Sequence, residues 1–237
     1  MAERFASYNY ENFRFGPYKE LFRNFPNVQK LGSEAPDFEC ADINGNRVSL
    51  SDHRGRFVVL EFGCLTCAPA ATQLAIYPTS ISRRLVPMFS GEEVDFIMIY
   101  TREAHPGELV PAHSSFNEKA GRARQFKEID DLKLKVLVDD LEGTIHKKYG
   151  ELPNMAYIID RQGKIVYKAS WTDAGDVETS LRNLLLSEKG AKARRTLGVV
   201  EKLIFIEDDN VELHSSIYAR GGRQSLEEVR RELGLDV

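Results

Sequence analysis

Apolar residues along the chain occur either in short continuous runs or in stripes spaced three and four residues apart. Phe57–Phe62 and Val94–Thr101 are near-continuous apolar runs, which are typical of central strands covered on both faces. Shorter runs predict further strands over 135–139, 155–160 and 165–170. A polar Asn-Gly-Asn stretch divides residues 38–50 into two segments and predicts a β-hairpin.

Helical spacing lies between these runs. An apolar stripe predicts one long helix from about Ala68 to Phe89, kinked at Pro78. The stripe consists of Leu74, Tyr77, Ile81, Leu85 and Met88. Three further helices are predicted over 116–129, 143–149 and 177–186.

The N-terminal residues 1–30 are aromatic-rich and irregular. Within them, 17–25 suits one short amphipathic helix with Leu21 and Phe25 on one face. We interpret this part as an arm packed on the main domain. A partly ordered tail is the alternative.

The C-terminal residues 189–237 differ from the rest of the chain. They contain a predicted strand over 202–206 and a final helix, with Ser225 as N-cap and Glu228 closing a capping box. They hold no catalytic motif. We expect this extension either to cover an edge strand or to make a homodimer contact.

Alternating strands and helices predict an α/β domain with helices on both faces of a sheet. A parallel core followed by a C-terminal hairpin and a last helix is the order of the thioredoxin-like fold. The opening hairpin is the usual addition in peroxiredoxin-like proteins. We therefore predict a thioredoxin-like domain over 31–188, with a central mixed β-sheet flanked by helices, between the arm 1–30 and the extension 189–237.

Composition narrows the class of protein. The chain is 42% hydrophobic and 29% charged, ordinary values for a globular domain. Its net charge of −4 argues against nucleic acid or a membrane surface as partner. No apolar leader opens the chain, and no stretch approaches the ~20 apolar residues of a membrane span. We therefore expect a cytoplasmic protein whose three cysteines are reduced.

The candidate chemistry lies in Cys64-Leu-Thr-Cys67, between a predicted central strand and the long predicted helix. Unpaired N–H groups and the helix dipole at such a joint stabilise a thiolate, the nucleophilic form of cysteine. In thioredoxins five steps separate the strand's phenylalanine from the attacking cysteine, as from Phe62 to Cys67 here. Cys67 is therefore the predicted nucleophile, and Cys64 is the candidate resolving thiol.

Other interpretations of these cysteines stay open. A Cys-x-x-Cys pair also occurs in zinc sites, but no second such pair completes one in this sequence. Cys64 and Cys67 could also serve as small core residues. Cys40, in the predicted hairpin, is interpreted as a buried structural thiol. No metal or cofactor is expected.

Two further segments are expected near Cys67. Glu103-Ala-His-Pro106 follows the second central strand, whose carboxyl end meets the same sheet edge. There His105 could move a proton to or from the thiol, and Glu103 could orient the imidazole. The alternative is a surface histidine. Pro153 precedes another core strand, where thioredoxin folds carry a cis-proline facing the active cysteine.

Together these residues resemble the iodothyronine deiodinase family over about residues 32–186. Phe62-Gly63 and Thr66-Cys67-Ala-Pro69 are similar to the family's Phe-Gly-Ser-Cys-Thr-Sec-Pro-Pro, with Cys67 at the selenocysteine. Ile99-Tyr100 and Glu103-Ala-His-Pro106 are similar to Ile-Tyr-Ile-Glu-Glu-Ala-His-Pro. Residues 152–168 resemble the strands that follow in the family.

The resemblance implies reductive removal of iodine from iodothyronines by an external thiol reductant. It makes Cys67 catalytic, His105 and Glu103 its pocket partners, and Pro153 the cis-proline. With Cys64 as the candidate resolving thiol, the predicted catalytic residues are Cys67, Cys64, His105 and Glu103, and the predicted substrate-binding residues are Pro153 and Thr66. The sequence departs from the family in having cysteine instead of selenocysteine. We therefore predict a deiodinase-like thiol oxidoreductase acting on a small molecule or a disulfide, with thioredoxin or glutathione as reductant.

Two other functions remain as alternatives. A peroxidase would act on peroxide, but peroxiredoxins place threonine three residues before the cysteine and proline seven before. Cys64 and Leu60 occupy those positions here. A binding module that kept the fold and lost the chemistry is the other alternative.

Overall fold

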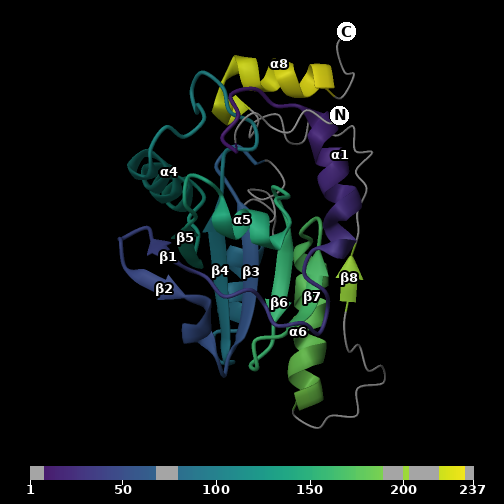
Figure 1. The fold of residues 1–237 in the computed structure, drawn as a ribbon. Helices are drawn as coiled ribbons and strands as arrows, with labels where there is room; N and C mark the ends of the chain where they lie inside the picture. Colours follow the sequence, from purple (N-terminus) through teal and green to yellow (C-terminus); the bar gives the residue numbers. More distant parts are fainter. Residues whose placement is uncertain (1–7, 68–79, 189–199, 203–218, 233–237) are drawn as a thin grey trace.

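The computed structural model describes residues 8–67, 80–188, 200–202 and 219–232. The strands in these ranges form one 8-stranded mixed sheet in the order β2-β1-β5-β4-β3-β6-β7-β8 (Figure 1). The strands are β1 (Glu39–Asp42), β2 (Arg47–Ser49), β3 (Phe57–Gly63), β4 (Val94–Tyr100), β5 (Lys135–Val138), β6 (Ala156–Ile159), β7 (Ile165–Ala169) and β8 (Val200–Lys202). The helices are α1 (Phe15–Asn24), α3 (Val86–Met88), α4 (Phe116–Ile129), α5 (Thr144–Tyr149), α6 (Ala174–Glu188) and α8 (Arg223–Glu232), with short turns of helix η1 (Phe25–Asn27), η2 (Leu50–His53), η4 (Ile81–Leu85) and η5 (Ala219–Gly221).

The pairing of the central strands decides where the site lies. β3 runs parallel to β4 in a register that ends with Gly63 beside Tyr100, and β4 runs parallel to β5. β6 is antiparallel to β3, and β7 is antiparallel to β6, so β7 runs in the same direction as the core strands. The segments that leave β3 and β4 therefore start side by side, which brings residues 64–67 next to residues 101–113. The predicted α/β order and the opening hairpin are confirmed.

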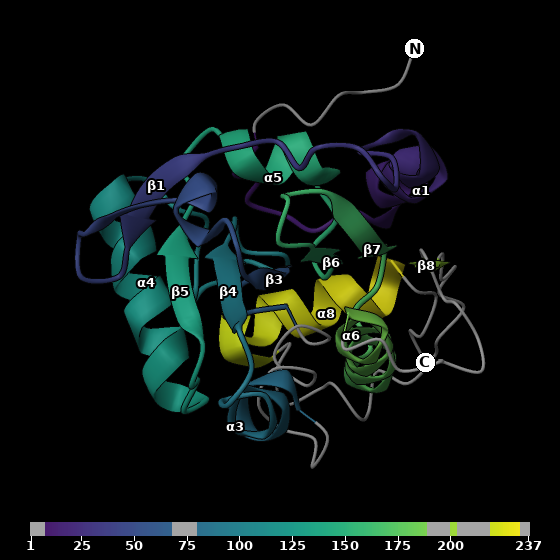
Figure 2. The same ribbon diagram turned by 90° about the horizontal axis from the view of Figure 1, so that it is seen from below.

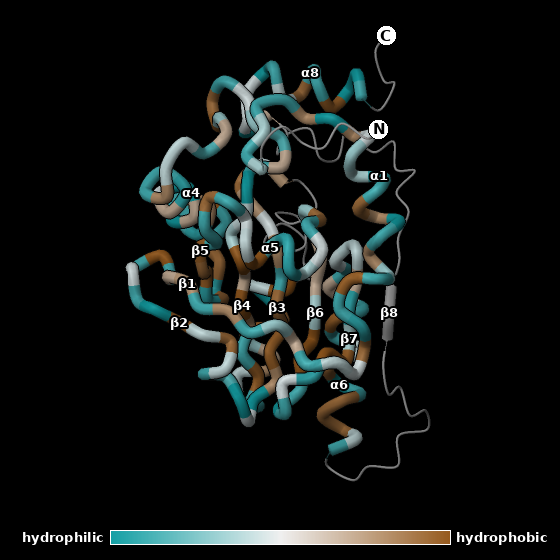
Figure 3. The backbone as a smooth tube through the Cα atoms, viewed as in Figure 1, coloured by the Kyte–Doolittle hydropathy of each residue, from teal (hydrophilic) through white to brown (hydrophobic). Residues whose placement is uncertain are grey.

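Helices cover both faces of the sheet. α6 and α3 lie on one face, while α5 and α1 lie on the other (Figure 2). Every residue of β3 is buried, as its apolar sequence predicts. The hydrophobic colouring of Figure 3 is accordingly concentrated on the strands in the middle of the sheet.

The long helix predicted over 68–89 is wrong in its second half. Residues 68–79 lie outside the described residues, so the predicted kink at Pro78 is not described. Ser80 has an extended backbone (φ −62°, ψ 146°), and its Oγ accepts the Arg83 N–H at 3.1 Å. A new helical segment therefore starts after Ser80. It opens with a π-helical turn, η4, before α3.

The N-terminal residues from Tyr8 onward pack on the rest of the described chain. α1 buries Tyr18 and Phe22, whereas the predicted inward residue Leu21 is only half-buried. The Nζ atom of the buried Lys168 donates to the Phe25, Pro26 and Val28 carbonyls at 3.2, 3.3 and 3.0 Å. This ammonium group stabilises the carboxyl end of the α1–η1 segment.

The C-terminal helix begins differently from the prediction. Ser225 is not the N-cap but a buried residue inside α8. The first N–H groups of α8, from Arg223 and Gln224, instead donate to the Glu108 carboxylate at 2.5 and 3.0 Å. A partner from a distant loop thus replaces the local cap. In the ranges that the structure describes, no helix is both long enough and apolar enough to cross a membrane.

Candidate active site at the carboxyl end of β3

Cys64 and Cys67 lie in one tight turn directly after β3. The Cys67 N–H donates to the Cys64 carbonyl at 3.3 Å, which closes a four-residue turn. Both side chains are fully buried and both thiols are free. Such a turn keeps its end Cα atoms within about 7 Å, and a disulfide needs about 4.4–6.8 Å. The turn therefore suits a reversible disulfide.

The Glu103 carboxylate holds the centre of this turn. One oxygen accepts the Thr66 N–H at 3.0 Å and the Thr66 hydroxyl at 2.7 Å. The other accepts the Tyr100 hydroxyl, and that same Tyr100 oxygen accepts the Leu65 N–H at 3.3 Å. Burial and the adjacent Glu103 raise the pKa of Tyr100 well above its usual value, so the phenol keeps its proton and donates.

The histidine beside Glu103 is His113, and the predicted pairing of Glu103 with His105 is wrong. His113 Nε2 lies 3.5 Å from the Glu103 carboxylate. Burial lowers the pKa of His113, although Glu103 opposes that shift. The His105 main chain donates to the Thr66 hydroxyl at 3.1 Å, and its ring packs on Phe13 with centroids 4.3 Å apart. The contact described for the His105 ring is therefore with Phe13 and not with the carboxylate.

Burial also determines the protonation state of His105. It lowers the pKa of His105 to about 3, because an imidazolium is poorly solvated in the protein interior. His105 is therefore neutral at physiological pH. With so low a pKa the His105 ring is neither a ready proton donor nor an effective base at that pH, and it acts through hydrogen bonding and packing.

The two thiols have different surroundings. Cys64 Sγ accepts the Ala104 N–H at 3.1 Å and lies 3.8 Å from the Thr66 hydroxyl. Burial, a side-chain hydrogen bond with Cys67 and the charge of Glu103 raise the pKa of Cys64 well above its usual value. Cys67 Sγ donates to the Pro153 carbonyl at 3.4 Å.

Pro153 lies against Cys67, but its predicted cis peptide bond is wrong. All peptide bonds in the described ranges are trans, as most X-Pro bonds are. The chain turns before β6 at Glu151, which has a φ of +62°. His146 Nε2 lies 2.9 Å from the Leu152 carbonyl, and this hydrogen bond helps to hold the Leu152–Pro153 peptide.

Sequence analysis missed two residues of this region. Glu61 is a buried carboxyl group on β3, and its Oε1 has no hydrogen-bond partner in the described structure. Burial raises the pKa of Glu61 to about 8. A single charged residue in an otherwise apolar central strand was the available signal. Arg220, from the C-terminal segment, donates to the Leu65 carbonyl at 3.3 Å, and no local pattern marked it.

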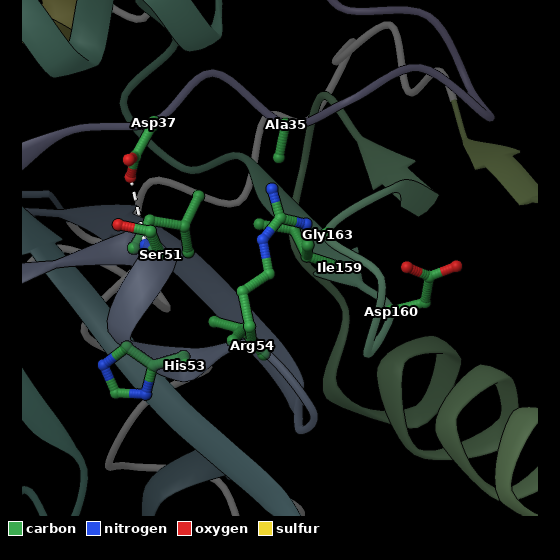
Figure 4. Close-up of a pocket in the computed structure, with 10 residues that line it drawn as sticks. Ala35, Asp37, Ser51, His53, Arg54, Ile159, Asp160 and Gly163 are labelled. Carbon is green, nitrogen blue, oxygen red and sulfur yellow. Dashed lines mark hydrogen bonds between the residues drawn. The ribbon is translucent and has the colours of Figure 1, made fainter.

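A separate small cavity lies at the opposite end of the sheet. Figure 4 shows Arg54 and His53 among its lining residues, with Ile159 and Asp160 from the end of β6. Its volume is about 10 Å³, room for about one water molecule. It shares no lining residue with the cysteine turn. Among the described residues, no three or more His, Cys, Asp or Glu side chains are grouped to hold a metal ion.

Curated proteins of three kinds are similar in sequence to this chain. The thiol-disulfide oxidoreductase ResA of Bacillus thuringiensis is 26% identical over 58% of this chain and 68% of ResA. The thyroxine 5-deiodinase of Ovis aries is 28% identical over 65% of this chain, which spans 54% of that enzyme. The peroxiredoxin Bcp of Bacillus subtilis is 25% identical over 58% of this chain and 82% of Bcp.

Solved structures confirm the thioredoxin-like fold. The thioredoxin domain of a thiol-disulfide oxidoreductase from Bacteroides vulgatus superimposes with a TM-score of 0.50 at 19% identity, covering 64% of this chain and 98% of that domain. An uncharacterized conserved protein from Geobacillus kaustophilus gives a TM-score of 0.54 at 19% identity, covering 77% of this chain and 95% of that protein.

The family resemblance expected from the motifs is also confirmed. The family model described as iodothyronine deiodinase matches residues 3–187. That range contains the Cys64–Cys67 turn, the loop with Glu103 and His105, and Pro153. The match extends over most of the 237 residues. The chain therefore belongs to the iodothyronine deiodinase family.

Proposed function

We propose that this protein is a thiol–disulfide oxidoreductase in which Cys67 attacks the substrate and Cys64 resolves the intermediate. The observation that carries the proposal is the single turn that holds both free thiols at the carboxyl end of β3. Similarity to ResA, a thiol-disulfide oxidoreductase, supports a disulfide as the electrophile.

The two thiols suit different steps. The raised pKa of Cys64 keeps that side chain a thiol at neutral pH, so it is the poorer first attacker. Cys67 lies against Pro153, at the position where the fold's relatives form a substrate groove. These surroundings support Cys67 as nucleophile and Cys64 as resolving residue.

The reaction balances without a bound cofactor. The Cys67 thiolate attacks one sulfur of a substrate disulfide, the substrate S–S bond breaks, and one substrate thiolate leaves and takes up a proton. Cys64 then loses its proton and attacks Cys67. This step forms the Cys64–Cys67 disulfide and releases the second substrate thiol. The protein is oxidised by two electrons, and an external thiol such as thioredoxin or glutathione reduces it again.

The roles of the surrounding residues follow from their contacts. Tyr100 holds the Leu65 N–H and Glu103 holds the Thr66 N–H, and these two hydrogen bonds keep the sulfur atoms of the turn within reach of each other. The Thr66 hydroxyl accepts the His105 N–H and so joins the turn to the neighbouring loop. We propose that Glu103 and Thr66 position the thiols, and that neutral His105 shapes the pocket.

The test is reduction of a model protein disulfide, such as insulin, with dithiothreitol as the source of electrons. We expect Cys67→Ser to abolish turnover. We expect Cys64→Ser to trap a mixed disulfide between Cys67 and the substrate, detected as an added mass. Cys40→Ser is the matched control and should keep full activity, because burial raises the pKa of Cys40 to about 12 and that thiol is inert.

Other outcomes would change the assignment. If Cys64→Ser abolished turnover while Cys67→Ser trapped the substrate, the two roles would be reversed. If the parent did not raise the rate above that of dithiothreitol alone, and neither variant changed it, the protein would be a binding module. Two further assays with the same variants test other substrates. Release of iodide from an iodothyronine tests the substrate of the deiodinase relatives, and consumption of peroxide tests that of the peroxiredoxin relatives.

A further inference from the structure

The C-terminal segment Ala219–Glu232 lies across the end of the molecule at which β3 and β4 finish (Figure 1). Sequence analysis found no chemistry in this part of the chain. In the structure, however, one of its side chains contacts the main chain between Cys64 and Cys67. That side chain is Arg220.

Arg220 joins two separate elements. Its Nη1 donates to the Leu65 carbonyl at 3.3 Å and to one Asp130 carboxylate oxygen at 2.9 Å, while Nη2 donates to the other Asp130 oxygen at 2.7 Å. The Asp130 side chain is only 5% exposed and that of Arg220 19%. This is a bidentate, largely buried pair of the kind that fixes geometry.

The Leu65 carbonyl receives its hydrogen bond from Arg220, whereas neighbouring polar main-chain groups of the turn bind elsewhere. The Leu65 N–H binds Tyr100 and the Thr66 N–H binds Glu103, both from the neighbouring strand and loop. The Cys64 carbonyl binds the Cys67 N–H. Arg220 approaches the turn from the C-terminal segment and donates to the Leu65 carbonyl. Because Asp130 balances its charge, its effect on the turn is one of position.

Close packing fixes where Arg220 can stand. A Cβ at Gly221 would lie 2.5 Å from the His105 carbonyl oxygen, so only glycine allows the segment to approach this loop so closely. The Ser225 hydroxyl donates to that same carbonyl at 3.0 Å, and Glu108 caps the start of α8. These contacts hold the residue next to Arg220 against the loop that carries Glu103.

We propose that Arg220 is a positioning residue for the Cys64–Cys67 turn, and that through it the C-terminal segment adjusts the balance between dithiol and disulfide. This inference rests on the proposed thiol–disulfide function. Arg220 contacts the turn while both cysteines are free thiols, and the proposal is that forming the disulfide shifts the Leu65 carbonyl and weakens this contact, so that Arg220 favours the dithiol. Without Arg220, formation of the disulfide becomes more favourable.

The experiment compares full-length Arg220→Gln, Arg220→Lys and Arg223→Gln with the parent protein. Each is equilibrated with mixtures of reduced and oxidised glutathione, and the fraction with a Cys64–Cys67 disulfide is measured by mass spectrometry. We expect Arg220→Gln to raise the equilibrium constant for the disulfide about threefold to tenfold, the effect of losing one hydrogen bond of ordinary strength. Arg220→Lys should restore part of the difference.

Arg223→Gln is the matched control, because Arg223 lies on the same segment and its side chain pairs with the exposed Glu227, while no contact with the cysteine turn is found among the described residues. It should leave the equilibrium constant unchanged. Asp130→Asn is a second variant that keeps Arg220, in case Arg220→Gln fails to fold, and it should shift the constant in the same direction by less. An unchanged constant in folded Arg220→Gln, or an equal shift in Arg223→Gln, would overturn the proposal.

Amide hydrogen exchange separates this proposal from the proposed function. We expect peptides spanning residues 64–67 to exchange faster in Arg220→Gln than in the parent or in Arg223→Gln. If the parent forms no Cys64–Cys67 disulfide, the proposed function fails, and exchange alone then decides whether Arg220 holds the turn. Equal exchange in all three proteins would refute the positioning role.

Discussion

Glu61, in the middle of β3, and Glu103, in the loop after β4, are both 2% exposed, yet their surroundings are opposite. Glu103 accepts two hydrogen bonds from Thr66 and one from Tyr100. Glu61 lies on an apolar strand, and its Oε1 has no partner in the described structure. Burial raises the pKa of Glu61 to about 8.

The difference shows that hydrogen bonding, and not burial alone, decides what a buried carboxyl group does. The Thr66 and Tyr100 groups that donate to Glu103 stabilise its buried carboxylate, and the carboxylate in turn holds the cysteine turn in place. The Glu61 carboxyl keeps its proton at neutral pH because burial disfavours the anion and, among the described residues, no donor reaches its Oε1. Four substitutions test this contrast, in order of expected effect.

The largest effect is expected from Glu103→Ala. It leaves the Thr66 N–H, the Thr66 hydroxyl and the Tyr100 hydroxyl without their buried acceptor, so the free energy of unfolding should fall by about 3–5 kcal/mol. Denaturant unfolding measures it. Glu103→Gln keeps an acceptor oxygen, so its free energy of unfolding should fall by less. A loss below about 1 kcal/mol in Glu103→Ala would show that the donors find other partners.

Next in size is the pH dependence due to Glu61. Its pKa rises from an ordinary value of 4.5 to about 8 on folding, so the folded state binds the proton more tightly. The stabilisation is complete below about pH 4.5 and is lost as pH rises through about 8. As pH rises between these values, the free energy of unfolding of the parent should fall by on the order of a few kcal/mol relative to that of Glu61→Gln, whose side chain does not titrate. Parallel pH profiles for the two proteins would refute the assignment.

A smaller effect is expected where the loop of Glu103 meets the C-terminal segment. Gly221→Ala would place a methyl group 2.5 Å from the His105 carbonyl oxygen and 2.7 Å from the Ser225 Cβ, and such overpacking costs about 1–3 kcal/mol. Gly91→Ala is the control, since no atom lies within 4 Å of a Cβ there. Thermal unfolding should separate the two variants, and equal melting temperatures would mean that the segment shifts freely.

The smallest effect is expected from an exposed glutamate. Glu20 pairs with Arg23 at 2.6 Å, and both side chains are about two-thirds exposed (66% and 67%). Glu20→Gln should change the free energy of unfolding by less than about 0.5 kcal/mol. Denaturant curves at low and high salt check this expectation. A loss comparable to that of Glu103→Ala would show that burial is not what separates these carboxylates.

Much of the fold could be predicted because its signals are local. Phe116–Ile129 was predicted with the bounds that α4 has, since its N-cap Ser115 and its spacing are both written in consecutive residues. The apolar runs of β3 and β4 likewise identified central strands. The break at Ser80 was missed, because the apolar stripe continues through it with unchanged spacing.

The candidate site was predictable only in part. Strand ends that meet at one sheet edge brought Cys67 and the loop of Glu103 together, as the topology implied. The choice of His113 over His105 as the neighbour of Glu103 could not be predicted, because it depends on how the loop turns after Ala104. The bond at Pro153 has the ordinary trans geometry, whereas the fold alone predicts the cis form.

By itself the sequence determined the strand and helix order, the family and the pair of cysteines, because periodicity, turn residues and motifs are properties of neighbouring positions. Only the tertiary structure decided the charge of Glu61, the partners of Glu103 and the approach of Arg220 to Leu65. Arg220 and Leu65 are 155 residues apart in the chain. Hydrogen bonds and burial between such distant residues exist only once the chain has packed, so no local pattern contains them.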